Sequence, residues 1–597
     1  MEYLQEWLNS EGYAKFKEAV KINCEPANES EPYFFKYKAR GILKTLKEKI
    51  EEDFKNVYNN SNIKNNDSFD CNQKEIIEVL DVNDLLAELC YELGLNFIEC
   101  EEVSTGEEYL SKCIEYFETE NNFKLTSLQL AAYNQLGILW SNRSCHDKAF
   151  DYLKKAESLY EKNEKTLYLS YLDFHNIWKP SEEKSSYLES KAYYESLHTL
   201  TLYYLAQVLG HLGKPKESAM YCHITLVRQM NTKQYDPLDW SLCCATLSQY
   251  YITKDEYKFA RYCLSCAEHI NKEVFVKFDA EEFSQESERE HSKEKILKSR
   301  ADIKRCWLKY TLNLLKSSCE KLFEVRERNN ENQTLDDTSD KENKLKFGDL
   351  EVSVYEEQVT DLFVSNYTDA KKLFNFFNLC LQSAKEFYKL DGYVSDYTEI
   401  TQDFSQFYKN LALFDDDFEN RCKMHKRRID MLKPILLELN PQHFLQICRQ
   451  LTFEIAECYT EMADLKRKIL EENTDKFSSK AVRKINSLLL QSIKYYNGFV
   501  DTYRKAGDLP KDFESDDVRP ILMCFFCMAR CYAKYLTNDK KGKLEYMHKE
   551  KSCYKFIVNY CDNHPDMPKV FEEELSVSKE MYALFDTKLN NVMNSMA

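Results

Sequence analysis

Apolar side chains recur at steps of three and four residues along most of the chain, which is the spacing of one helix face. Ile303, Trp307, Tyr310 and Leu314 show this period and predict one amphipathic helix at 296–323. Only 12 glycines and 11 prolines occur in 597 residues, so long helices joined by short turns are expected. The pattern therefore predicts an all-α protein.

The clearest internal repeat lies at 126–163. Large side chains surround Gly137 on its first predicted helix, and Ala149 follows twelve residues later on the second. Small residues on both helices allow a close crossing, which is the tetratricopeptide pattern. The same interval separates Gly94 from Gly106, Ala206 from Ser218, and Ser248 from Ala260. The sequence thus predicts four helix pairs, at 84–118, 126–163, 199–229 and 240–270.

These helix pairs predict an α-solenoid with two subdomains. We expect an N-terminal tetratricopeptide-like subdomain at 1–295, a linker helix at 296–323, and a C-terminal subdomain of irregular helical repeats at 349–597. The C-terminal part keeps the helical period of apolar residues but departs from the tetratricopeptide pattern. The solenoid is therefore expected to continue, less regularly, toward the C-terminus.

Four segments interrupt the helical pattern. Asparagine-rich or strongly charged composition predicts disorder at 56–73, 279–295 and 324–348. A wider gap between two repeats predicts a long ordered loop at 167–191, with Trp178 as its anchor. Loops of this kind often carry binding function.

Composition and charge narrow the class of protein. A formal net charge of −18 argues against a nucleic-acid partner and favours either a basic partner or simply a well-solvated surface. The N-terminus lacks the features of a secretory signal, so the 22 cysteines are expected to be reduced thiols. No apolar run of about 18 residues occurs, so no membrane insertion is expected. These features predict a soluble, cytoplasmic protein.

The residues that could support chemistry have structural explanations. Cys263 and Cys266, with Cys524 and Cys527, form two CxxC pairs that could in principle bind zinc. Both pairs lie within predicted helices, where the pattern requires small apolar residues, so core packing is favoured. The sequence also lacks glycine-rich phosphate loops and any Cys–His or Ser–His arrangement at a strained turn. We therefore expect no cofactor, metal, small-molecule substrate or enzymatic activity.

One dense basic run has two interpretations. Its side chains could bind an anion or an acidic partner, or they could form salt bridges with acidic residues along and between helices. The acidic residues just before the run favour salt bridges. The run consists of Lys423, His425, Lys426, Arg427 and Arg428.

Several strings resemble the kinesin-binding protein family, also called the KIF-binding protein family. They are ESLHTLTLYYLAQV, YCHITLVRQ, CATLSQYYI, AKEFYKLDGYVSDYTEI, RCKMHKRRIDML, ELNPQHF and YKFIVNYCDNHP, in the family's order. The resemblance runs from about residue 30 to the end. Three insertions differ from the family in length or composition, at 56–73, 167–191 and 279–295.

The resemblance implies both a fold and a function. The fold is a right-handed α-solenoid whose two subdomains are bridged by a long helix. The function is to hold motor domains of certain kinesins in the concave groove of the N-terminal subdomain, which keeps them off microtubules and regulates transport and axon outgrowth. The resemblance also places the protein with the cytoskeleton. Five residues match family positions implicated in motor binding: Tyr204, Gln207, Gln229, Thr246 and Leu247.

The repeat pattern bears on these positions independently. Gln207 directly follows the small residue of its helix, a position that faces the groove of a tetratricopeptide superhelix, and Gln249 does the same. A buried, unpaired amide would be costly, which also favours exposure of Gln207. Leu247 instead occupies a core position of the pattern, so core packing and partner binding both remain open for it.

Two other binding functions are considered. A co-chaperone of this class would hold a peptide carboxylate with an asparagine after each small residue, whereas Leu95, Ile138, Gln207 and Gln249 stand there. The sequence therefore argues against a co-chaperone. A scaffold that binds another helical or peptide partner stays open.

Overall fold

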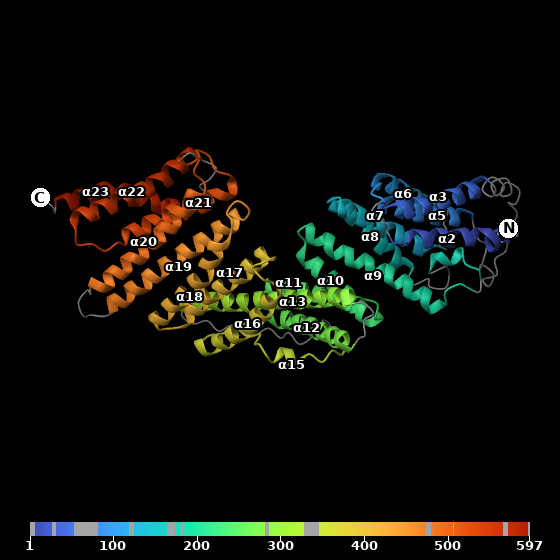
Figure 1. Cartoon of the computed structure of the whole chain (residues 1–597), viewed down its shortest axis with the longest axis horizontal. Coiled ribbons are helices and arrows are strands. Elements are labelled where there is room, and N and C mark those ends of the chain that lie inside the picture. Colours follow the sequence, from blue (N-terminus) through green and yellow to red (C-terminus); the bar gives the residue numbers. More distant parts are fainter. Residues whose placement is uncertain are drawn as a thin grey trace. The chain divides into compact units, whose positions relative to one another are not determined.

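A computed structural model describes most of the chain (Figure 1). It describes residues 6–26, 31–52, 82–118, 125–163, 173–180, 183–280, 286–327, 346–472, 479–505, 507–564 and 571–594. Within these residues the chain is helical and contains no strand; Lys505 and Asp508 form an isolated bridge. The all-α prediction is confirmed. The predicted disorder at 56–73 lies outside the described residues.

The chain divides into two compact units. Unit 1 comprises 1–250 and 337–350, and unit 2 comprises 251–336 and 351–597. The division falls between Tyr250 and Tyr251, inside the predicted N-terminal subdomain and inside the fourth predicted repeat. The linker role expected for 296–323 stays a prediction.

Unit 1 is built from successive helix pairs, in which α5 packs against α6, α7 against α8, and α9 against α10 (Figure 1). Its elements are a π-helical turn η1 (Leu8–Gly12), α2 (Tyr13–Asn23), α3 (Phe34–Ile50), α5 (Val82–Glu99), α6 (Val103–Glu118), α7 (Thr126–Asn142), α8 (His146–Asn163), a 3-10 turn η4 (Phe174–Ile177), α9 (Tyr187–His211), α10 (Pro215–Thr232) and most of α11 (Pro237–Ile252).

Unit 2 has a core of its own, formed by the apolar faces of its helices from α18 onward. The close pairs there include α18 with α19, α19 with α20, and α21 with α22. Its elements are α12 (Tyr257–Ala280), α13 (Glu286–Glu327), α15 (Ser353–Glu356), α16 (Tyr367–Phe387), α17 (Val394–Leu411), η6 (Ala412–Phe414), α18 (Phe418–Glu438), α19 (Leu445–Glu472), α20 (Ser479–Asp501), α21 (Ser515–Ala533), α22 (Lys540–Asn563) and α23 (Glu572–Asn594).

The small residues of the repeats lie at the helix crossings, as predicted. A Cβ atom added to Gly94 on α5 would lie 3.2 Å from the backbone oxygen of Gly106 on α6. In the α9–α10 pair, the Ser218 hydroxyl donates a 2.7 Å hydrogen bond to the Ala206 carbonyl. Because these backbones approach so closely, the pairs leave no room for larger side chains at these positions.

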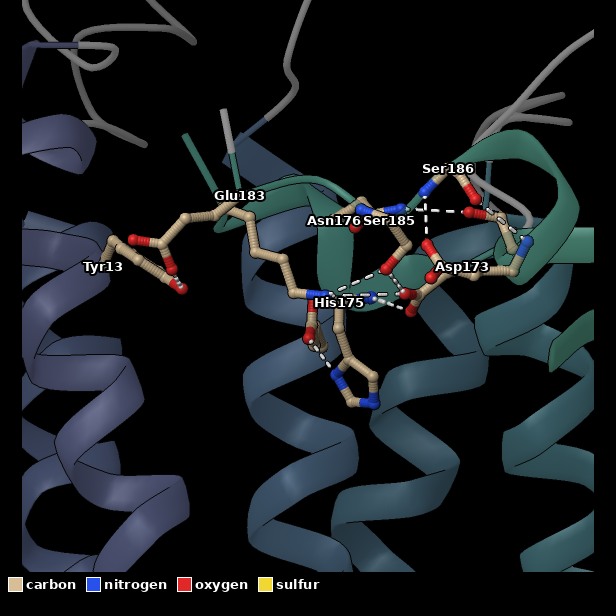
Figure 2. Close-up of polar contacts among 11 residues, drawn as sticks. Tyr13, Asp173, His175, Asn176, Glu183, Ser185 and Ser186 are labelled. Carbon is tan, nitrogen blue, oxygen red and sulfur yellow. Dashed lines mark hydrogen bonds and ion pairs between the residues drawn. The ribbon is translucent and has the colours of Figure 1, made fainter. Parts of the chain in front are cut away.

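The loop before α9 is anchored by Trp178, as expected. Trp178 is 2% exposed, and its ring stacks on Phe16 of α2 at a centroid distance of 4.5 Å. The Glu183 carboxylate accepts hydrogen bonds from Tyr13 (2.6 Å) and Lys17 (3.0 Å), which are also on α2 (Figure 2). The loop is thus tied to a helix far away in sequence. Residues 164–172 and 181–182 of this region lie outside the described residues.

A polar network organises the same loop (Figure 2). Asp173 accepts hydrogen bonds from the His175 N–H at 3.1 Å and from the Ser185 hydroxyl at 2.8 Å. The His175 ring lies 3.0 Å from the Glu88 carboxylate of α5. Complete burial raises the pKa of Glu88 to about 7, although His175 lowers it. The loop is therefore held by polar as well as apolar contacts.

Two predictions of disorder are wrong in part. Residues 286–295 form the first turns of α13, because their glutamate, lysine and arginine residues favour helix and Ile296 just after them is buried. At the end of 324–348, Phe347 is fully buried, with its ring 5.4 Å from Trp240 and 4.9 Å from His223. Both segments are rich in charged residues, and this composition led to the prediction of disorder. Residues 281–285 and 328–345 lie outside the described residues.

The structure agrees with the prediction that cysteines of the CxxC pairs pack in the core and that residues of the basic run form salt bridges. Cys263, Cys266 and Cys524 are buried in helices, and burial raises the pKa of the Cys266 thiol well above its ordinary value. In the basic run, Arg428 is buried 3.2 Å from Glu454 of α19. Lys426 pairs with an acidic residue one turn later on its own helix. Salt bridging thus explains these two basic residues.

No helix in the described part of the chain is both long and apolar enough to cross a membrane.

Candidate functional site

The predicted binding residues lie on α9, α10 and α11, which local sequence signals position. Ser186 and Glu189 form a capping box that begins α9. Pro215 begins α10 at a position where its missing N–H is not needed. In α11, the Trp240 indole donates a 3.1 Å hydrogen bond to the Leu226 carbonyl of α10. These contacts fix α11 against the preceding repeat.

Charged and hydroxyl groups also hold α9 and α10 in place. Arg228 of α10 donates a 2.5 Å hydrogen bond to Glu195 of α9. The Tyr221 hydroxyl of α10 donates a 2.8 Å hydrogen bond to Glu157 of α8. Because both carboxylates are largely shielded, these links support a rigid three-helix platform.

One side of α9 is only partly covered by the rest of unit 1. The half-buried residues on this side are Leu200, Tyr203 and Tyr204, and Gln207 next to them is exposed. Their spacing of three, one and three residues is that of one helix face. Tyr204 packs beside the cluster formed by Ala149 and its neighbours. The α9 side thus presents aromatic rings around one amide.

A matching stripe runs along α11. Leu242, Cys243 and Gln249 are half-buried, and Thr246 is exposed between them. The two stripes meet at Tyr203 and Cys243, which interact electrostatically: burial raises the pKa of Tyr203, and Cys243 of α11 raises it further. We call Leu200, Tyr203, Tyr204, Gln207, Leu242, Cys243, Thr246 and Gln249 the α9–α11 face.

The α9–α11 face is polar but carries little charge of its own. Its side chains offer two amides, a threonine hydroxyl and two phenols, all able to donate and accept hydrogen bonds. Asp239, exposed one turn before Cys243, is the carboxylate of α11; burial raises the pKa of Cys243, and Asp239 raises it further. Such a surface can recognise the backbone and side chains of a protein segment.

Three of the five predicted residues belong to the α9–α11 face, and two do not. Tyr204, Gln207 and Thr246 all belong to the α9–α11 face. Gln229 is half-buried in the last turn of α10, the helix between the two stripes. Leu247 is only 3% exposed, which favours core packing over partner binding for this residue.

Sequence reasoning missed part of the face. Leu242 and Cys243 precede Thr246 by four and three residues, so they share its side of α11. This period was present in the sequence, but both residues are apolar, a character that suits the core as well as an interface. Their partial exposure depends on which side of α11 the neighbouring helices leave open.

The described residues give no sign of a metal centre. No cluster of three or more histidine, cysteine, aspartate or glutamate side chains there has a geometry suited to a metal ion. The cysteines in these residues are free thiols, most of them buried.

Known proteins match the chain along nearly its full length. Residues 238–592 match the family model described as KIF-1 binding protein C terminal. The KIF-binding protein of Gallus gallus is 38% identical, with 97% of this chain and 96% of that protein covered. The KIF-binding protein of Homo sapiens is 36% identical, with 98% of each chain covered.

Solved structures give the same result. A structure described as Kinesin binding protein (KBP) matches with a TM-score of 0.60 at 32% identity, covering 96% of this chain and 98% of that one. A second, described as Cryo-EM map of KIFBP, matches with a TM-score of 0.61 at 32% identity, covering 98% of this chain and 99% of that one.

Proposed function

Because this chain belongs to the KIF-binding protein family, we propose that it binds the motor domains of a subset of kinesins and blocks their attachment to microtubules. The relatives' names supply the kinesin partner. The motor domain as the target, the α9–α11 face as the contact, and the block are our proposal. The observation that supports it is the partly open α9–α11 face, which includes the half-buried Tyr204 and the exposed Gln207 and Thr246.

The chemistry of the face suits a helical segment of a motor. Gln207 and Thr246 can hydrogen-bond polar side chains, while Tyr203 and Tyr204 offer ring surfaces for apolar contact. A motor surface that binds acidic tubulin must be basic, and this chain has a formal net charge of −18. Long-range attraction would therefore speed the encounter between the two proteins.

The proposed block works by occupation. A motor helix held in the concave groove of the first unit cannot lie on the microtubule lattice at the same time. Such a mechanism requires no nucleotide chemistry from this chain. At the level of the cell, its consequence would be regulation of microtubule-based transport and, where neurons are concerned, of axon outgrowth.

Direct binding tests the contact surface. Full-length protein is titrated into labelled kinesin motor domains from several subfamilies, and affinity is measured by fluorescence anisotropy. For motors that bind, we expect the Tyr204→Ala, Gln207→Ala double variant to lose at least tenfold in affinity, equivalent to about 1.4 kcal/mol. Thr246→Ala should weaken binding by a smaller factor, because it removes one hydroxyl.

Matched controls separate the face from the helices that bear it. Tyr187→Ala changes an exposed tyrosine in the first turn of α9, and Thr232→Ala changes an exposed threonine at the end of α10. Both should bind like the unmodified chain, and all variants should keep its helical circular dichroism. Full affinity in the well-folded double variant would remove the α9–α11 face from the proposal.

A further inference from the structure

Unit 2 contains a groove of about 660 Å³, separate from the α9–α11 face. Its walls come from α17, α19 and α21, with the end of α20 closing one side. The lining residues are Gln406, Lys409, Gln446, Arg449, Gln450, Phe453, Glu454, Glu457, Phe499, Tyr503, Asp516, Asp517, Arg519, Pro520 and Met523.

The middle of this groove is apolar and aromatic. Phe453 is half-buried, and its ring lies 6.0 Å from that of Phe499, which lies 5.6 Å from the Tyr503 ring. Met523 and Pro520, both half-buried, line the same groove from α21. The three rings support one another, so the floor is preformed for an apolar side chain.

The cations of the groove already have partners inside the unit. The Arg449 guanidinium lies 3.6 Å above the Tyr503 ring, and its Nε donates a 2.9 Å hydrogen bond to Thr502. Lys409 donates a 2.8 Å hydrogen bond to Glu457. Arg519 lies 3.4 Å from Glu574 on α23. These positive charges are therefore poorly placed to attract an acidic ligand.

The polar groups at the opening of the groove have fewer partners within the protein. The exposed Asp516 carboxylate accepts a 3.2 Å hydrogen bond from the Ser515 hydroxyl, which leaves its charge unneutralised by that contact. Pro520 lies one turn later and has no N–H, so the Asp516 carbonyl lacks its usual donor within the helix. The side chains of Gln446 and Gln450 are exposed on the opposite wall. The mouth thus offers an exposed carboxylate and two exposed amides.

We propose that this groove binds a basic amphipathic segment of a partner protein. One apolar side chain of the segment lies on the floor formed by Phe453 and Met523, and a nearby lysine or arginine pairs with Asp516. Gln446 and Gln450 hydrogen-bond the segment's backbone or polar side chains. The net charge of −18 on the whole chain favours the same class of partner. This inference does not depend on kinesin binding or on the α9–α11 face.

A peptide selection tests the groove with the full-length protein. A phage library of random 15-residue peptides is selected on the unmodified chain, and in parallel on the Asp516→Lys and Met523→Glu variants. Peptides enriched on the unmodified chain should carry lysine or arginine next to large apolar residues. An enriched peptide, synthesised with a fluorescent label, should lose at least tenfold in affinity for either variant.

A charge exchange makes the test specific. The same peptide with its basic residues replaced by glutamate should bind the Asp516→Lys variant better than the unmodified chain. Gln207→Ala, a change in unit 1, should leave peptide affinity unaltered, and circular dichroism should show that every variant is folded. Enrichment of acidic peptides, or equal binding to the unmodified chain and both groove variants, would overturn the proposal.

Discussion

Gly137 on α7 faces Leu153 on α8 so closely that a Cβ atom added to the glycine would lie 2.6 Å from the leucine Cγ. Leu153 is fully buried, so it has little room to move away. The crossing of this helix pair therefore depends on the absence of a side chain at one position. The same holds for the α5–α6 pair, where Gly94 and Gly106 meet.

Gly137→Ala should destabilise unit 1. The added methyl group overlaps a leucine in a packed crossing, and overpacking of this kind costs about 1–3 kcal/mol. The measurement is urea unfolding followed by tryptophan fluorescence. Gly41→Ala on α3 is the matched control, because nothing lies within 4 Å of the added atom. That control should be neutral or stabilising by up to about 1 kcal/mol, and a similar loss in both variants would refute a role for the crossing.

Trp178→Ala should loosen the loop before α9. The substitution removes a buried ring that stacks on Phe16 at 4.5 Å, and such losses cost about 3–5 kcal/mol. We expect faster proteolysis within the loop and a lower melting temperature. Trp140→Ala serves as the control, since Trp140 is only half-buried beside Lys148. If both variants melted alike, Trp178 would not be an anchor.

Arg428→Met should destabilise unit 2 strongly. Its guanidinium is fully buried, 3.2 Å from Glu454 and 3.5 Å from Glu457. Because Glu457 also pairs with Lys409, the loss of Arg428 leaves the buried Glu454 carboxylate without a cation. Breaking a buried pair in this way costs about 3–5 kcal/mol. Lys426→Met, which breaks an exposed pair with Asp430 on the same helix, should cost no more than about 0.5 kcal/mol. Equal unfolding midpoints for the two variants would contradict this account.

Glu550→Gln should stabilise unit 2 at pH 8 but not at pH 5. Glu550 is 5% exposed, and burial raises its pKa to about 7. Because the pKa of Glu550 is higher in the folded than in the unfolded chain, its protonation contributes to stability. This contribution is complete below about pH 4.5 and is lost as the pH rises through about 7.

At pH 8 the glutamine variant avoids burying a charge, which should raise its stability by up to about 3 kcal/mol. Thermal melting at the two pH values measures the difference. Glu545→Gln, an exposed position on the same helix, should show no such pH dependence. A gain at pH 5 equal to that at pH 8 would show that burial of charge is not the cause.

Much of the fold could be predicted because its signals are local. The twelve-residue interval between small residues located the helix crossings, and the helical period of Ile303, Trp307 and Tyr310 located the centre of α13. The start of α13 and the burial of Phe347 were missed. Both lie in highly charged sequence, and contacts with distant residues such as Trp240 decide their structure.

The site was less predictable than the fold. The position of Gln207 after a small residue indicated its exposure, and the structure agrees. Leu247 could not be assigned, because a leucine suits both a core and an interface; its burial favours the core. The exposed sides of α11 and the groove beside Phe453 depend on how several helices pack together, which a repeat pattern does not specify.

Microtubule co-sedimentation of kinesin motor domains, with and without the full-length protein, tests the central claim most directly. Motors from several subfamilies are bound to microtubules in a non-hydrolysable nucleotide state and then pelleted. The account predicts that some motors leave the pellet and appear in the supernatant as a complex with this chain, and that the Tyr204→Ala, Gln207→Ala variant releases fewer of them. If every motor remains in the pellet and no soluble complex forms, the proposed block is contradicted.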